Sequence, residues 1–383
     1  MKNSILSLLI FAVLEVAFGS EHNRTGASSH YYSKYPRRPY YVMYFANDKM
    51  GRLVKIDLHR PYSFIFGQEC FEINKCSTNS HGLPYNATRS KSQPITNAYL
   101  QEPPQIFSNH FTGQFYNDSL WLNDDSLPLD VAVITDGNRQ ESFEWDGVLG
   151  LGLDFGRPDL NTLAVEKLFD NYDQRRILIQ QGHNYISRTK QTIKGYKHLL
   201  SEGVITFGND SSPLCEEFDY YNTKNGKTWQ LVADVFIGFD IYYNQTISFL
   251  PGEYTQVPYH VFKKYFISND TKNPNIFQSE DDLPYLGFTL NGNDYMITKE
   301  DYSWVTKARY FDKTNYTLTL ESTKSKLYDF GFGSEFLQHY CIALTADEGL
   351  KNIQLGLAIN NDAYTIVLSL LVAVFFAVLS IMI

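Results

Sequence analysis

Asp57 is the residue of this chain best placed for acid–base chemistry. It follows three apolar residues and opens the stretch "DLHRPYSFIFGQEC", in which it stands 13 residues before Cys70. One form of such chemistry uses two carboxyl groups that share one proton around a water molecule, because like charges split their pKa values. The structural alternative is a turn carboxylate that accepts hydrogen bonds from its own loop, and we favour it for Asp57 over a catalytic role.

The other residue types of the chain indicate no second kind of reactive site. The nine His have no spacing typical of a pair of metal ligands, and the sequence contains no visible Ser/His/Asp arrangement. The glycines of "GLGLDFG" fit a strand and its turn rather than a loop that binds phosphate. We therefore expect no metal and no cofactor.

The composition of the 383-residue chain is typical of a folded, β-rich protein with two lobes of ordinary domain size. Hydrophobic residues make up 43%, charged residues 20% and aromatic residues 15%, which is enough for a packed core and favours strands. The net charge of −9 and the pI near 5.5 argue against a nucleic-acid partner.

Both ends of the chain carry targeting signals. Residues 1–19 have the positive start, apolar stretch and small-residue end of a secretory signal peptide. Residues 361–383 end in about 20 apolar residues without charge, long enough to span a bilayer. This tail predicts either a GPI-anchor signal, with attachment near Asn360 to Ala363, or a single membrane-spanning helix, and the sequence does not decide between them.

A secreted chain is exposed to glycosylation and to oxidation of its cysteines. Seven N-x-Ser/Thr sequons predict a glycosylated surface, at Asn23, Asn86, Asn117, Asn209, Asn244, Asn269 and Asn315. The four cysteines predict two disulfides. The spacing makes Cys70–Cys76 a local link, which leaves Cys215 to pair with Cys341. A zinc site is the alternative, although the spacing does not match a structural zinc motif.

Between its ends the chain is predicted to form mostly short strands. Helices are expected at 160–172 and at 257–266, the second entered through Pro258. Residues 286–302 predict a hairpin with Asn291-Gly292 at its turn. Strands are also expected at 40–45, 52–57, 128–136 and 203–208. Residues 20–39 are expected to form a loose N-terminal arm.

Several stretches resemble landmarks of the pepsin-type aspartic proteases, in that family's order and across nearly the whole mature chain. They are "FEWDGVLGLGLDF", "GVITFGNDSSPLC", "TWQLVADVFIG", "LPYLGFTLNGNDYMITKEDY" and "FGSEFLQHYCIALTADEGLKNIQLGLA". The resemblance implies an all-β dominated, bilobal fold with a few short helices and a cleft between the lobes. It implies an N-terminal lobe at 40–210 and a C-terminal lobe at 211–360.

The catalytic signature of that family, Asp-Thr/Ser-Gly in each lobe, is absent here. The resemblance places Asp57 at the first catalytic position, but Leu58 and His59 follow it. The second-lobe motif corresponds to "QTISFLPGEYTQVP", which puts Phe249 at the position of the second aspartate. Phe249 cannot hold a proton, and Pro251 removes a backbone N–H from the loop that follows. Both losses imply that the shared-proton chemistry is gone.

Two further positions bear on this prediction. The tyrosine of the family's flap over the cleft corresponds to Phe111, which lacks the hydroxyl. Asp240 is the nearest acid that could replace the lost aspartate, but it lies nine residues from the matched position and Thr-Gly does not follow it.

The sequence therefore predicts a catalytically inactive homologue of the aspartic proteases, glycosylated and held at the cell surface or secreted. The cleft is expected to bind a peptide or protein segment by strand-like pairing. An active aspartic-type endopeptidase with an atypical pair of acids is the first alternative. A structural surface glycoprotein with a closed cleft is the second.

Overall fold

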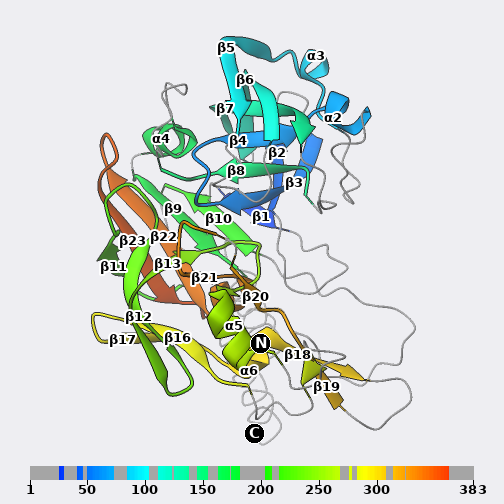
Figure 1. The fold of residues 1–383 in the computed structure, drawn as a ribbon. Helices are drawn as coiled ribbons and strands as arrows, with labels where there is room; N and C mark the ends of the chain where they lie inside the picture. Colours follow the sequence, from blue (N-terminus) through cyan, green and yellow to red (C-terminus); the bar gives the residue numbers. More distant parts are fainter. Residues whose placement is uncertain are drawn as a thin grey trace, which may run out of the picture.

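The structure is a computed structural model dominated by β-strands, with a few short helices (Figure 1). It describes residues 26–29, 41–45, 50–72, 84–102, 111–122, 125–137, 145–153, 163–172, 174–181, 203–208, 215–267, 276–277, 283–307, 314–323 and 325–361. The predicted all-β dominated fold class is confirmed. The signal peptide, the apolar tail, Cys76, Asn23, Asn209 and Asn269 lie outside the described residues.

Two seven-stranded sheets hold the two predicted catalytic positions, and they lie at the top and at the lower left of Figure 1. We call them the first sheet and the second sheet. The first sheet has the order β2 (Tyr41–Phe45), β3 (Met50–Asp57), β8 (Gly147–Gly150), β4 (Ser63–Phe66), β7 (Asp125–Gly137), β6 (Phe111–Leu122) and β5 (Gln93–Gln101). The second sheet has the order β17 (Asn293–Ile297), β16 (Leu286–Leu290), β12 (Leu231–Ile237), β13 (Asp240–Phe249), β21 (Phe330–Phe332), β14 (Gln256–Val257) and β20 (Glu321–Ser322).

The two sheets repeat one succession of strand pairings. In the first sheet β3 is antiparallel to β2 and parallel to β8, and β4 is antiparallel to β8 and parallel to β7. In the second sheet β13 is antiparallel to β12 and parallel to β21, and β14 is antiparallel to β21 and parallel to β20. This duplication places β3 and β13 at corresponding positions, although their partners β8 and β21 are far from them in the sequence. As a result, the loops after β3 and after β13 occupy corresponding places.

A six-stranded sheet lies between the first and second sheets in Figure 1, and we call it the central sheet. Its order is β1 (Gly26–Ser29), β10 (Gly203–Phe207), β9 (Arg176–Gln180), β22 (Tyr340–Asp347), β23 (Lys351–Ile359) and β11 (Asp219–Asn222). Strand β1 pairs with β10, so part of the predicted N-terminal arm is a strand rather than loose. A three-stranded sheet of β15 (Ile276–Phe277), β19 (Thr314–Leu318) and β18 (Ser303–Lys307) completes the described strands.

The local predictions agree with the described elements. The hairpin β16–β17 turns at Asn291 and Gly292, whose φ angles of 50° and 87° suit a type I′ turn. Pro258 caps α5 (Tyr259–Tyr265) as predicted, and α4 (Ala164–Asp170), with its N-cap at Leu163, lies within the helix expected at 160–172. The other helices among the described residues are α2 (Gln68–Glu72), α3 (Ala87–Ser90), α6 (Lys299–Tyr302) and α7 (Ser334–Leu337). No helix among the described residues is long and apolar enough to cross a membrane.

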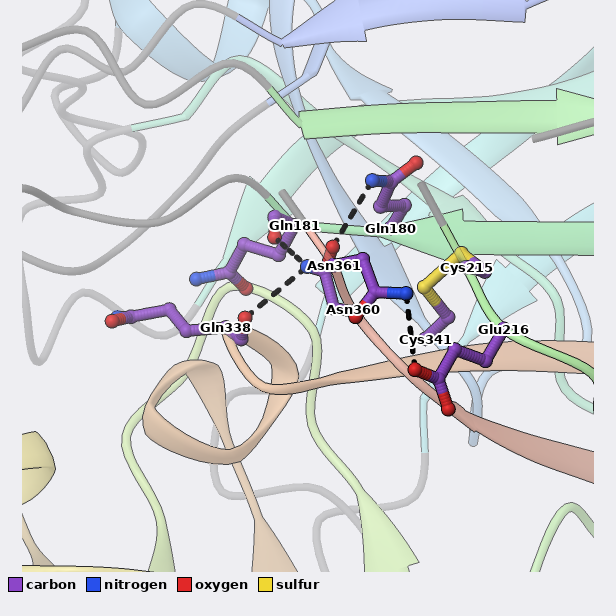
Figure 2. Close-up of a disulfide and its surroundings, with 8 residues drawn as sticks. All are labelled: Gln180, Gln181, Cys215, Glu216, Gln338, Cys341, Asn360 and Asn361. Carbon is purple, nitrogen blue, oxygen red and sulfur yellow. Dashed lines mark hydrogen bonds between the residues drawn. A yellow bond between two sulfur atoms is a disulfide. The ribbon is translucent and has the colours of Figure 1, made fainter. Parts of the chain in front are cut away.

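The Cys215–Cys341 disulfide confirms the predicted pairing and joins the segment before β11 to β22 (Figure 2). Cys70 is also disulfide-bonded, as predicted, although its expected partner lies outside the described residues. Near the Cys215–Cys341 link, buried Asn360 donates hydrogen bonds to the carbonyls of Gln181 (2.7 Å) and Gln338 (3.1 Å). These bonds hold the ends of β9, β23 and α7 together.

Candidate functional site

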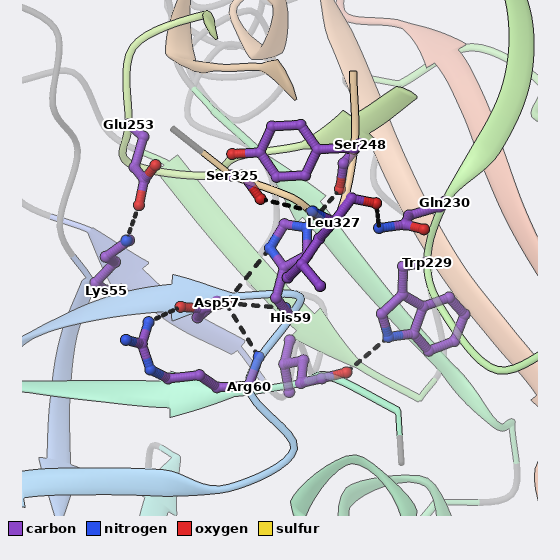
Figure 3. A network of polar contacts seen from close by, with 12 residues as sticks. Lys55, Asp57, His59, Arg60, Trp229, Gln230, Ser248, Glu253, Ser325 and Leu327 are labelled. Carbon is purple, nitrogen blue, oxygen red and sulfur yellow. Dashed lines mark hydrogen bonds and ion pairs between the residues drawn. The ribbon is translucent and has the colours of Figure 1, made fainter. Parts of the chain in front are cut away.

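The Asp57 carboxylate ends β3 and binds its own loop. Its Oδ1 accepts hydrogen bonds from the backbone N–H of His59 (2.8 Å) and of Arg60 (3.2 Å), and Oδ2 accepts one from Arg60 Nη1 at 2.5 Å (Figure 3). Only 6% of the residue is exposed. Asp57 is therefore the turn carboxylate that its sequence context favoured, with Arg60 as an additional charged partner.

Arg60 connects Asp57 to a second buried acid, Glu102. Arg60 Nε donates to Glu102 Oε1 at 2.7 Å, and Glu102 also accepts hydrogen bonds from the Tyr62 hydroxyl and from the backbone N–H of Phe111. The Glu102 side chain is fully buried. A buried charge is stable only when it is paired and hydrogen-bonded, and this cluster satisfies both conditions. Arg60 stands three residues after Asp57, so the sequence contained a signal for their pairing.

Phe111, predicted at the flap over the cleft, places its ring in the core of the first sheet. The ring is buried and lies 5.0 Å from the ring of Phe64 and 5.5 Å from that of Phe66, measured between centroids. Its backbone contributes to the site through the bond to Glu102. Phe111 thus supports the Arg60–Glu102 pair without presenting a side chain to a substrate.

Three groups hold Asp57 in its ionised form. Burial by itself would raise the pKa of the Asp57 carboxyl, but the Arg60 guanidinium, the neighbouring His59 and the charge of Lys55 together keep it well below its usual range. In the opposite direction, Glu102 and Asp57 raise the pKa of Arg60 above its already high value despite its burial. Asp57 is therefore held as a carboxylate paired with Arg60.

Phe249 ends β13 in the second sheet as Asp57 ends β3 in the first. It is fully buried, and its ring lies 5.5 Å from Phe336, 6.2 Å from Phe288 and 6.5 Å from Phe332, between centroids. The side chain belongs to the aromatic core of its own sheet. This position offers neither a proton nor a place for a water molecule.

Four contacts join residues of the β3 and β8 region to residues that surround the end of β13. His59 Nε2 and Ser248 Oγ are 2.8 Å apart, and the His59 ring lies 5.2 Å from the Tyr328 ring. Lys55 forms an ion pair with Glu253 (Figure 3). In addition, the Trp229 indole N–H donates to the backbone carbonyl of Leu151 at 2.6 Å. The surroundings of Asp57 are therefore occupied by contacts between the part of the protein that contains the first sheet and the part that contains the second sheet. We call these parts the two halves.

Ser248, His59 and Asp57 form a line of hydroxyl, imidazole and carboxylate that the sequence did not reveal. The distance from His59 Nδ1 to Asp57 Oδ1 is 3.7 Å, longer than a hydrogen bond, and Ser248 is only 1% exposed. A serine nucleophile needs an oriented base and access for its substrate. In this geometry the His59–Ser248 bond acts as a link between the two halves.

Glu253 is a second acid near the end of β13, and it pairs with Lys55 of β3. Burial would raise the pKa of Glu253, but Lys55 keeps it below its usual value. The pKa of each acid is therefore lowered beside its own cation, which favours the ionised form of both. Asp240, the candidate from sequence, is exposed and contacts Lys264 and Tyr265. It begins β13, about 30 Å of strand away from Phe249.

The described sequons have different surroundings. Asn86 caps the N-terminus of α3 by accepting from the backbone N–H of Arg89 at 3.0 Å, while Asn117 is exposed on β6. Asn244 is exposed on β13, and Asn315 lies in β19.

A scan against models of known protein families finds none that matches this chain, and a search of the curated proteins finds no match either.

Proposed function

We propose that this protein is a catalytically inactive homologue of the pepsin-type aspartic proteases. The observation that carries the proposal is the contrast between Asp57, held ionised by Arg60, and Phe249, buried among aromatic rings. No proton is shared between carboxylates at these two positions, so a water molecule has no general base paired with a general acid. The repeated pairing of β3 and β13 with their neighbours supports the family assignment.

We place the protein in the secretory pathway and at the cell surface or outside the cell, on the strength of its two end signals, its sequons and its disulfides. Because Asn360 is buried and hydrogen-bonded at the end of the central sheet, lipid attachment would have to follow it. The partner that we propose is an extended peptide or protein segment bound between the two halves.

A structural glycoprotein is the second candidate function. The contacts His59–Ser248 and Lys55–Glu253 favour it, since they fill the junction between the two halves next to Asp57. A library of extended peptides separates the two candidates. Saturable binding that weakens in His59→Ala would support the binding protein, and the absence of any bound peptide would support the structural one.

Proteolysis is the first test. The purified protein would be incubated with an unfolded protein from about pH 3 to pH 7, the range across which carboxylates change charge. Fragments would be identified by mass spectrometry beside Asp57→Ala and Glu253→Gln as controls. We expect an intact substrate at every pH. Cleavage that disappears in both variants would replace this proposal with an active Asp57/Glu253 pair.

A further inference from the structure

The outer face of the β12–β13 hairpin exposes several large apolar side chains. Phe239 at the tip is 97% exposed, Tyr243 is 64% exposed and Ile241 is 52% exposed. The strand register explains this exposure: Val235 and Tyr242 face the core as one cross-strand pair, so the neighbouring residues face outward. Contiguous apolar surface of this kind is normally covered in a soluble protein.

Asn244 lies beside these side chains at an irregularity of the hairpin. The register shifts between Ala233 and Val235, so that Tyr243 and Asn244 both lie opposite Asp234. Asn244 has a left-handed φ of 53°, and its backbone N–H donates to Asp234 Oδ1 at 2.9 Å. Among the described residues its side-chain amide has no hydrogen-bond partner. Asn244-Gln245-Thr246 is also a sequon, so its exposed amide is a potential attachment point for sugar.

We propose that Asn244 carries an N-linked glycan whose first N-acetylglucosamine packs against Tyr243 and Ile241 and covers this face. The inference rests on the proposed secretory route. In the attachment step, the Asn244 side-chain nitrogen bonds to C1 of the sugar of a lipid-linked oligosaccharide. The bond from C1 to the pyrophosphate oxygen breaks, the lipid pyrophosphate leaves, and the nitrogen loses one proton.

The chemistry of the sugar suits this surface. One face of a pyranose ring presents C–H groups, which pack on an aromatic face, while its hydroxyls remain in water. A glycan therefore removes apolar surface from water and presents a polar surface in its place. An amphipathic Tyr243 side chain contributes an apolar ring without burying its hydroxyl.

Asn117 provides a matched comparison on the first sheet. It is exposed on β6, but its register partners are Gln93 and Asp130, which offer the sugar no aromatic face. Asn86 is less suitable, because its side chain already caps α3 and donates to Gln68 Oε1 at 3.0 Å. A glycan at Asn117 should therefore leave the stability of the fold unchanged.

The test uses the full chain produced through the secretory pathway of a eukaryotic host. Glycopeptide mass spectrometry would measure occupancy at Asn244 and Asn117. Each glycosylated fraction would then be trimmed enzymatically to one N-acetylglucosamine per site, and thermal unfolding would be followed for Asn244→Gln, Tyr243→Ser, the double variant and Asn117→Gln. Tyr243→Ser is expected to fold because Tyr243 is mostly exposed.

We expect Asn244→Gln to lower Tm by about 2 °C more in the original background than in the Tyr243→Ser background. Asn117→Gln should not change Tm. An equal loss of Tm in both backgrounds would overturn the packing of sugar on Tyr243. If other sequons carry sugar and Asn244 does not, the proposed site is wrong but the secretory route stands. If no sequon carries sugar, the proposed secretory route is wrong as well.

Discussion

The ends of β3 and β13 follow the same strand pairings, but they bury opposite kinds of side chain. At the end of β3, Asp57 lies in a cluster of charges in which every acid has a cation or a donor. At the end of β13, Phe249 lies among aromatic rings that need no partner. The comparison teaches that one backbone arrangement can bury either a charged side chain or an aromatic one. The charged side chain must find all of its ion-pair and hydrogen-bond partners within the protein.

Among the variants that test this comparison, Phe249→Asp should lower the stability of the protein most. Loss of the ring costs about 3–5 kcal/mol, and an unpaired carboxylate in an aromatic core adds to that cost. Urea unfolding followed by tryptophan fluorescence would measure the change, with Phe249→Leu as the control for volume alone. Burial raises the pKa of the new carboxyl, so the deficit should shrink as the pH falls from that raised pKa toward about 4, where the unfolded carboxyl is also protonated. A variant as stable as the original that cleaves protein would contradict our account of both strand ends.

Arg60→Met should have the next largest effect, because it leaves two buried acids without their cation. Removing one partner from a buried ion cluster costs about 3–5 kcal/mol. Equilibrium unfolding would test this. Arg60→Lys is the control, because it keeps the charge but cannot bind Asp57 and Glu102 at the same time through separate guanidinium nitrogens. Adding Asp57→Asn should recover part of the loss. A change below about 1 kcal/mol would show that the cluster is held by other groups.

Asp57→Asn should have the smallest effect of the three at neutral pH, since Arg60 keeps Glu102 and the amide oxygen can still accept from the loop. The pKa of Asp57 is lowered in the fold, so its ionised form stabilises the protein above the unfolded pKa of about 3.9. That stabilisation is lost as the pH falls through the lower, folded value. The original protein should therefore lose more stability than the variant between pH 4 and pH 2. If the free energy of unfolding falls equally with pH in both proteins between pH 4 and pH 2, the pairing of Asp57 with Arg60 is refuted.

The elements of the second sheet were the most predictable part of the fold. The Asn291-Gly292 turn and the Pro258 helix start are local signals, since a few residues fix the backbone angles. The absence of a proton-carrying side chain at Phe249 was equally readable. By contrast, the duplicated strand order was not predictable, because pairings such as β13 with β21 join residues more than 80 positions apart.

The sequence by itself determined that Phe249 has no proton-carrying side chain and that Arg60 follows Asp57 by three residues. Only the tertiary structure decided which groups compensate the buried charge. Glu102 reaches Arg60 across 42 residues, and Glu253 reaches Lys55 across 198. The physical reason is that an ion pair depends on distance and burial in space, and neither is encoded in the spacing of residues along the chain.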